Sequence, residues 1–169
     1  MSLNILFFHS ILRYLVLLFA VIVVLQSLMG MLGKKPFNKS NKMMALALMI
    51  CCDIQLLLGF AVYFMNGWLD RVKGMSAITD LDAKHVTRFF GMEHSVTMLI
   101  VIVLIHIGYS NIKKNIDDDR KYKRLFWYTL IALILCVAMI PWPGKKYVGR
   151  PLIPATTFVQ LLPANIANT

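Results

Sequence analysis

The chain has 169 residues, of which 59% are hydrophobic and only 15% are charged, and its formal net charge is +10. Soluble domains usually carry about 25% charged residues. This composition therefore nearly excludes a soluble enzyme, and it also excludes a disordered chain. The lysines and arginines cluster between long apolar segments, so membrane topology explains the positive charge better than nucleic-acid binding does.

Four segments are long and apolar enough to cross a membrane, which takes about 20 residues per helix. Backbone polar groups in lipid must be satisfied within each segment, so helices are expected. The sequence therefore predicts an all-α fold, an integral membrane four-helix bundle followed by an extended, Pro-rich C-terminal tail. The transmembrane domain is expected at 1–141, with spans at about 3–33, 42–67, 88–115 and 121–141, and the tail at 142–169.

A weak internal repeat accompanies these spans. Phe-Phe-His-Ser at 7–10 is similar to Met-Glu-His-Ser at 92–95, and a pair of lysines closes each of the two spans that these motifs open. If the repeat is real, the bundle consists of two parallel helical hairpins. The alternative is two ordinary hairpins that share common residues.

The distribution of lysines and arginines predicts the orientation of the spans. Ten lie in or beside the connections at 33–42 and 113–124, and seven lie at 68–88 and in the tail. Because the more basic side faces the cytoplasm, both termini are expected to be periplasmic in a bacterial inner membrane. The expected partners are the lipid bilayer and either another membrane protein or a second copy of this chain, without nucleic acid.

Several polar side chains fall inside the predicted spans, where ionisable groups are costly and are candidates for function. They are expected to be buried in the bundle: His9, Arg13, Asp53, Gln55, Glu93, His94 and His106.

His9 and His94 open two spans that run in the same direction, so both are expected near the outer surface. Counted from the starts of the spans they are at similar depth, whereas counted back from the lysine pairs they differ by about 9 Å, and the sequence does not choose between the two. Arg13 follows His9 by four residues and shares its helix face, and Glu93 is its expected partner. Deeper in the membrane, Asp53 and His106 are at similar depths on antiparallel neighbours. A contact between them would hold the imidazole tautomer or shuttle a proton.

Each of these residues also has a simpler structural interpretation. His9 and His94 are then histidines in contact with water at the membrane interface, and Arg13 reaches outward to lipid phosphate. His106 is then a histidine hydrogen-bonded inside the bundle. Asp53 is the hardest to explain in this way, because a carboxyl group so deep needs a partner or a proton.

Three segments resemble small four-helix bacterial membrane proteins labelled "cytochrome B". They are 8–14 (FHSILRY), 53–59 (DIQLLLG) and 93–98 (EHSVTM). The resemblance implies a non-covalent haem b between helices, histidine axial ligands, and electron exchange with a quinone or a redox partner. Only one bis-histidine haem is available, because the second and fourth spans contain no histidine. Its expected ligands are His9 and His94, with Arg13 beside a haem propionate or Glu93.

Three functions remain open at this point. The first is electron transfer through one haem near the outer face, by a carrier rather than a stand-alone enzyme and with no catalytic residue. The second is a cofactor-free accessory or structural subunit of a larger membrane complex. The third is a proton-coupled carrier that uses Asp53 and His106.

Overall fold

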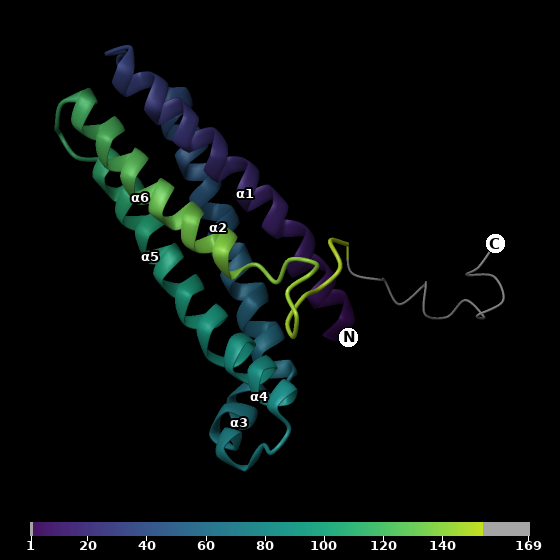
Figure 1. Ribbon diagram of the computed structural model, residues 1–169. Coiled ribbons are helices and arrows are strands. Elements are labelled where there is room, and N and C mark those ends of the chain that lie inside the picture. Colours follow the sequence, from purple (N-terminus) through teal and green to yellow (C-terminus); the bar gives the residue numbers. More distant parts are fainter. Residues whose placement is uncertain (1, 154–169) are drawn as a thin grey trace, which may run out of the picture.

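The computed structural model describes residues 2–153, and the rest of the predicted tail, 154–169, lies outside the described residues. The described chain is all-α and contains no strand (Figure 1). In chain order the elements are α1 (Ser2–Leu32), α2 (Lys39–Met65), α3 (Trp68–Lys73), the 3₁₀ turn η1 (Met75–Ala77), α4 (Leu81–Arg88), the π-helical turn η2 (Phe89–Glu93), α5 (His94–Ile112) and α6 (Asp118–Met139).

The prediction of four apolar helices is confirmed. The helices long and apolar enough to cross a membrane are Asn4–Leu32, Lys39–Met65, Leu81–Ile112 and Asp118–Met139. The third begins earlier than expected, because α4, η2 and α5 form one continuous helix. The short helix α3 precedes it, in a segment that was expected to be a loop.

The four long helices form a bundle in which each packs against two neighbours. Both α1 and α5 pack against α2 and α6, so α1 and α5 face each other diagonally. They also run in the same direction (Figure 1). We call the end with the connections 33–38 and 113–117 the lysine end. The opposite end, with the start of α1, the helices α3 and α4 and the tail, is the histidine end.

Small and β-branched side chains form the centre of the bundle. On α1 the buried residues Val16, Ala20, Val23 and Ser27 follow a spacing of three and four residues, which places them on one face. They meet similarly small residues of the other helices, such as Ala45 on α2. Large aliphatic and aromatic side chains instead cover the outside of the bundle, as expected of a surface that faces lipid.

Polar contacts close the lysine end. Asn38 caps the first turn of α2 through a reciprocal pair of hydrogen bonds with Asn41. The Asp118 carboxylate accepts a hydrogen bond of 2.9 Å from the Phe37 backbone N–H. The Tyr122 hydroxyl lies 3.0 Å from the Pro36 carbonyl oxygen. These contacts tie the first connection to the start of α6.

The described part of the tail, 142–153, is turned rather than extended, so that prediction is wrong here. Gly144 has φ +93, which favours glycine, and the Gly149 N–H donates to the Lys145 carbonyl at 2.9 Å. The Arg150 N–H donates to the Pro141 carbonyl at 3.0 Å. These turns bring the tail back across the histidine end to α1 (Figure 1).

Candidate functional site at the histidine pair

The two histidines expected near the outer surface lie together. The ring centroids of His9 and His94 are 6.4 Å apart, and the ring planes are inclined by 71°. His9 is on α1, and His94 is the first residue of α5, so the two rings meet across the diagonal of the bundle.

The π-helical turn η2 directly precedes His94, and tight packing holds it in place. A Cβ atom on Gly91 would lie 2.3 Å from Val72 Cγ2, so only glycine allows this approach to α3. The Tyr63 hydroxyl donates to the Gly91 carbonyl at 3.1 Å, and the Ser95 hydroxyl donates to the Phe90 carbonyl at 2.8 Å. Turns of this kind are rare and occur frequently at functional sites.

A backbone carbonyl fixes the orientation of His94. Its Nδ1 lies 3.0 Å from the carbonyl oxygen of Met139, the last residue of α6. A carbonyl oxygen only accepts hydrogen bonds, so Nδ1 carries the proton and Nε2 keeps a free lone pair. Metal-binding histidines are commonly oriented in this way, by a hydrogen bond from the other ring nitrogen.

Helix α2 forms the wall behind His9. The Gln55 side-chain amide donates to the His9 carbonyl at 2.8 Å and lies 3.5 Å from His9 Nε2. One turn further along α2, a Cβ atom on Gly59 would lie 3.2 Å from His9 Cε1. Glycine at this position therefore gives the imidazole its space.

Polar atoms without a partner gather around this pair. Buried side-chain atoms that lack a hydrogen-bond partner among the described residues include His9 Nδ1, Arg13 Nε and Gln55 Oε1. Buried polar atoms are nearly always paired, so each exception calls for an explanation, and an absent ligand is one of them. Their location on adjacent faces of α1 and α2 favours a single common cause.

The expected contact between Arg13 and Glu93 is wrong. The Arg13 guanidinium donates to the Leu152 carbonyl of the tail at 2.8 Å, and the Tyr14 hydroxyl donates to the same oxygen at 2.7 Å. Glu93 instead forms an ion pair of 2.8 Å with Arg88, one turn away, and its side chain is 41% exposed. The π-helical turn directs Glu93 outward, away from α1.

The tail also supplies cations that the sequence alone does not connect with the histidines. The Lys145 ammonium lies 5.5 Å from the Phe89 ring, and the Arg150 guanidinium lies 5.2 Å from the Phe90 ring. Both rings contact the His94 imidazole, with centroid distances of 6.0 and 6.3 Å. Only the tertiary fold brings these cations to the site, and no sequence spacing indicates it.

The contact expected between Asp53 and His106 is present, with Oδ1 and Nε2 3.3 Å apart. The expectation that these side chains are buried is wrong, because they are 43% and 42% exposed at the surface between α2 and α5. Position along a helix gives depth, whereas exposure depends on rotation about the helix axis. This pair forms a second polar site, separate from the histidine pair.

The geometry of the histidine pair suits one kind of metal group. Among the described residues, no three His, Cys, Asp or Glu side chains lie close enough to hold a metal ion together. Two imidazoles are too few for a bare ion, but they can occupy the two axial positions of a haem. Nitrogens about 2 Å from a shared metal would place the ring centroids roughly 6 Å apart, a spacing with which the 6.4 Å between His9 and His94 is compatible.

Comparison with protein-family models, with curated proteins and with solved structures finds no match to this chain. The function is therefore inferred from the geometry of the two polar sites.

Proposed function

We propose that the protein is a membrane electron carrier of the b-type cytochrome kind, with one non-covalent haem held between α1 and α5 at the histidine end. The observation that carries this proposal is the separation of 6.4 Å between the His9 and His94 rings. The free Nε2 lone pair of His94 and the unpartnered polar atoms around His9 support it independently. When bound, haem supplies a one-electron couple that the side chains alone lack.

The residues of the site have distinct roles in this proposal. His9 and His94 would hold the haem iron, and the Met139 carbonyl holds the imidazole of His94 in position. Gln55 and Gly59 support His9 from behind. The apolar bundle excludes water, which strengthens electrostatic interactions at the site.

Positive charges near the site favour its more electron-rich state. Arg13 lies one turn from His9, while Lys145 and Arg150 lie against rings that contact His94. No acidic side chain pairs with these three cations among the described residues. Arg13 and Lys145 donate to the backbone carbonyls of Leu152 and Ala138, which leave their charges uncompensated. The field of these cations would raise the reduction potential of a bound haem.

Absorption spectroscopy on the detergent-purified protein, reconstituted with haem, tests the proposal. We expect a Soret band and a sharp α-band on reduction, and we expect both His9→Ala and His94→Ala to lose this low-spin spectrum. His85→Ala is the matched control, because His85 is a histidine at the same end whose ring stacks on that of Tyr147 instead, with centroids 4.9 Å apart. His106→Asn is a second control, and both controls should keep the spectrum.

Two results would contradict the proposal. One is a protein that stays colourless after reconstitution although it remains folded. The other is a spectrum that survives both ligand substitutions, because the iron would then be held elsewhere. A colourless protein that co-purifies in fixed ratio with another membrane protein would instead favour a cofactor-free accessory subunit.

A further inference from the structure

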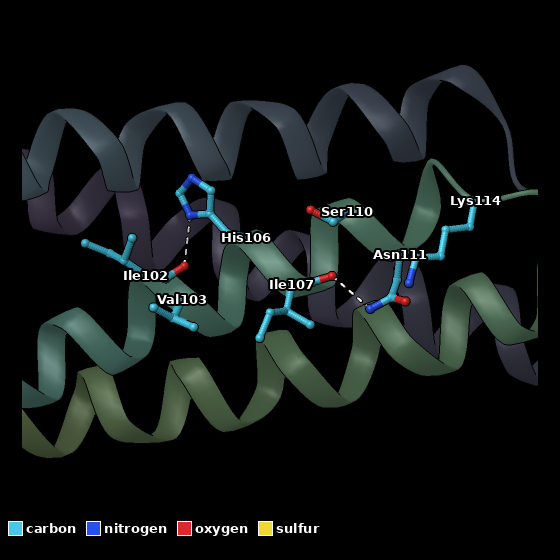
Figure 2. Close-up of a pocket in the computed structure, with 7 residues that line it drawn as sticks. All are labelled: Ile102, Val103, His106, Ile107, Ser110, Asn111 and Lys114. Carbon is cyan, nitrogen blue, oxygen red and sulfur yellow. Dashed lines mark hydrogen bonds between the residues drawn. The ribbon is translucent and has the colours of Figure 1, made fainter.

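The ion pair between α2 and α5 lies beside a groove on the surface of α5. The groove has a volume of about 520 Å³, and it is lined by Ile102, Val103, His106, Ile107, Ser110, Asn111 and Lys114. Figure 2 shows Ile102 and Val103 at one end of this set, His106 next to them, and Lys114 at the other end, where α5 reaches the connection to α6. The groove therefore joins the middle of the bundle to the lysine end.

The hydrogen positions on His106 follow from its neighbours. Its Nδ1 lies 2.9 Å from the Ile102 carbonyl oxygen, which only accepts, so Nδ1 carries a proton (Figure 2). Its Nε2 faces Asp53 Oδ1 at 3.3 Å. A bare ring nitrogen and an ionised carboxylate repel at this distance, so one further proton belongs to the pair, on either partner.

With this proton the pair has no net charge, which suits its position in an apolar span. Without it, one carboxylate would remain uncompensated near lipid, where an unpaired charge is costly. Helices α1, α2 and α5 contain no other carboxylate. On the two helices that carry the pair, the other titratable side chains nearest along the chain are Cys51, Cys52 and Tyr109. Tyr63 and His94 lie toward the histidine end, and Lys39 and Lys42 lie toward the lysine end.

These neighbours do not supply the missing proton. Arg124 already donates to the Asn111 side chain at 2.7 Å. Helix α1 has no charged side chain between Arg13 and Lys34. The groove reaches His106 from the lysine end, and within a largely apolar lining Ser110 and Lys114 supply polar side chains that can support water.

Polar residues follow this route at helical spacing. His106 and Ser110 are four residues apart, so they lie on one face of α5, and Lys114, two residues beyond the end of this helix, lines the same groove. They span about 12 Å along the axis. Ser110 and Lys114 are exposed. Toward the histidine end, the same face carries Ile102 and Leu99, which are apolar and give water no support.

We propose that Asp53 and His106 form a membrane-embedded site that binds one proton and exchanges it with water from the lysine end, through the groove on α5. This site is independent of the histidine pair. In the exchange, a proton leaves the pair for water next to Ser110 and Lys114, and the pair then has a charge of −1 until it is protonated again. The bundle can thus take up a proton from one side of the membrane only.

The first test locates the shared proton in the full-length protein in lipid vesicles at neutral pH. We expect either an imidazolium signal from His106 in ¹⁵N NMR or a protonated-carboxyl band of Asp53 in the infrared spectrum. The Asp53→Asn variant, which has nearly the same shape, should lose that signal, and His106→Asn identifies the histidine resonance. A neutral imidazole beside an ionised carboxylate would overturn the proposal, as would a signal unchanged in Asp53→Asn.

The second test measures the direction of access by transferring the vesicles into heavy water and following deuteration of the same signal. Ser110→Phe blocks the groove between the pair and Lys114, and Leu99→Phe is a matched substitution toward the histidine end. We expect exchange roughly tenfold slower or more in Ser110→Phe, because the polar route is closed. Leu99→Phe should match the original protein. Equal rates in the two variants, or slowing only in Leu99→Phe, would overturn the proposed route.

Discussion

The chemistry of this bundle depends on where its few polar side chains meet small residues. Gly59 leaves space for the His9 imidazole, and Gly91 allows η2 to approach Val72. At the lysine end, Gly30 lies directly against the ring of Tyr122. Each of these glycines is needed for close approach and not for an unusual backbone angle, so substitutions there have specific consequences.

Replacement of Gly59 by leucine should disturb the histidine pair more than the fold. A Cβ atom at this position already lies 3.2 Å from His9 Cε1, so a longer side chain displaces the ring. We expect Gly59→Leu to lose most of the haem spectrum of the reconstituted protein while its helix content is kept. Leu57→Phe, at a neighbouring position that is 67% exposed, is the control and should retain the spectrum. Equal spectra in the two variants would count against the packing of His9 on α2.

Replacement of Gly30 by alanine should destabilise the lysine end. The added Cβ would lie 2.3 Å from the Tyr122 ring, whose hydroxyl is already held near Pro36 and Asn41. Overpacking of this kind typically costs about 1–3 kcal/mol, and it should lower the midpoint of thermal unfolding in detergent. Gly74→Ala is the control, because its Cβ would meet only an ordinary contact of 3.4 Å with the Asp70 carbonyl. A variant as stable as the control would contradict the packing described here.

At the scale of elements, the turn η2 sets the relation between α4 and α5. A π-helical turn contains one residue more than an α-helical turn, so it rotates the helix before it relative to the helix after it. This places His85 of α4 against Tyr147 of the tail, with ring planes inclined by only 8°. It also leaves His94, at the start of α5, facing α1.

Deletion of Met92 from this turn should remove the contact of His85 with Tyr147 while the helix that begins at His94 is kept. The deletion converts η2 to an ordinary α-helical turn and rotates α4 by about 100° relative to α5. We expect His85 to lose Tyr147, so that hydrogen exchange of the backbone amides at 145–150 becomes faster, while α5 and α6 keep their protection. Met92→Ala, which keeps the turn, is the control. Unchanged exchange in the deletion variant would show that the tail is held without α4.

The elements also show which features the sequence could predict. The four long helices follow from hydropathy and length alone, and the start of α2 agrees with the polar cap at Asn38. The turn η2 could not be predicted, because it depends on the packing of Gly91 against α3, a helix in a segment that was expected to be a loop. The turns of the tail depend likewise on tertiary contacts, such as that between Arg13 and the Leu152 carbonyl.

At the scale of the whole molecule, the two polar sites lie at different depths. Depth counted along the chain predicts proximity of Asp53 to His106, whereas for His9 and His94 it depends on the end from which the helices are counted. Both contacts are present. The exposure of Asp53, His106 and Glu93 was not expected, because rotation about the axis cannot be read from an almost uniformly apolar helix. Sequence therefore located the polar groups, and only the fold shows which of them share a site.

The charge difference between the two ends predicts how the molecule inserts. Ten lysines and arginines lie at or near the lysine end, and eight, including Arg13, lie at the histidine end or in the tail, so we expect the lysine end to face the cytoplasm. A phosphatase fused after residue 153 should then be active outside, and a fusion in the connection 113–117 should be inactive. Removal of the charges at Lys34, Lys35, Lys113 and Lys114 should weaken this difference. The reverse pattern of activity would contradict the orientation.

The anchoring of the tail has a consequence for biogenesis. Arg13 binds the carbonyl of a residue 139 positions later in the chain, and domains assemble progressively as the ribosome releases them. The first helix is therefore synthesised long before the tail residue whose carbonyl Arg13 binds at the histidine end. Under the proposed function, a haem that binds before the tail reaches Arg13 would meet a histidine pair that this part of the chain does not yet cover.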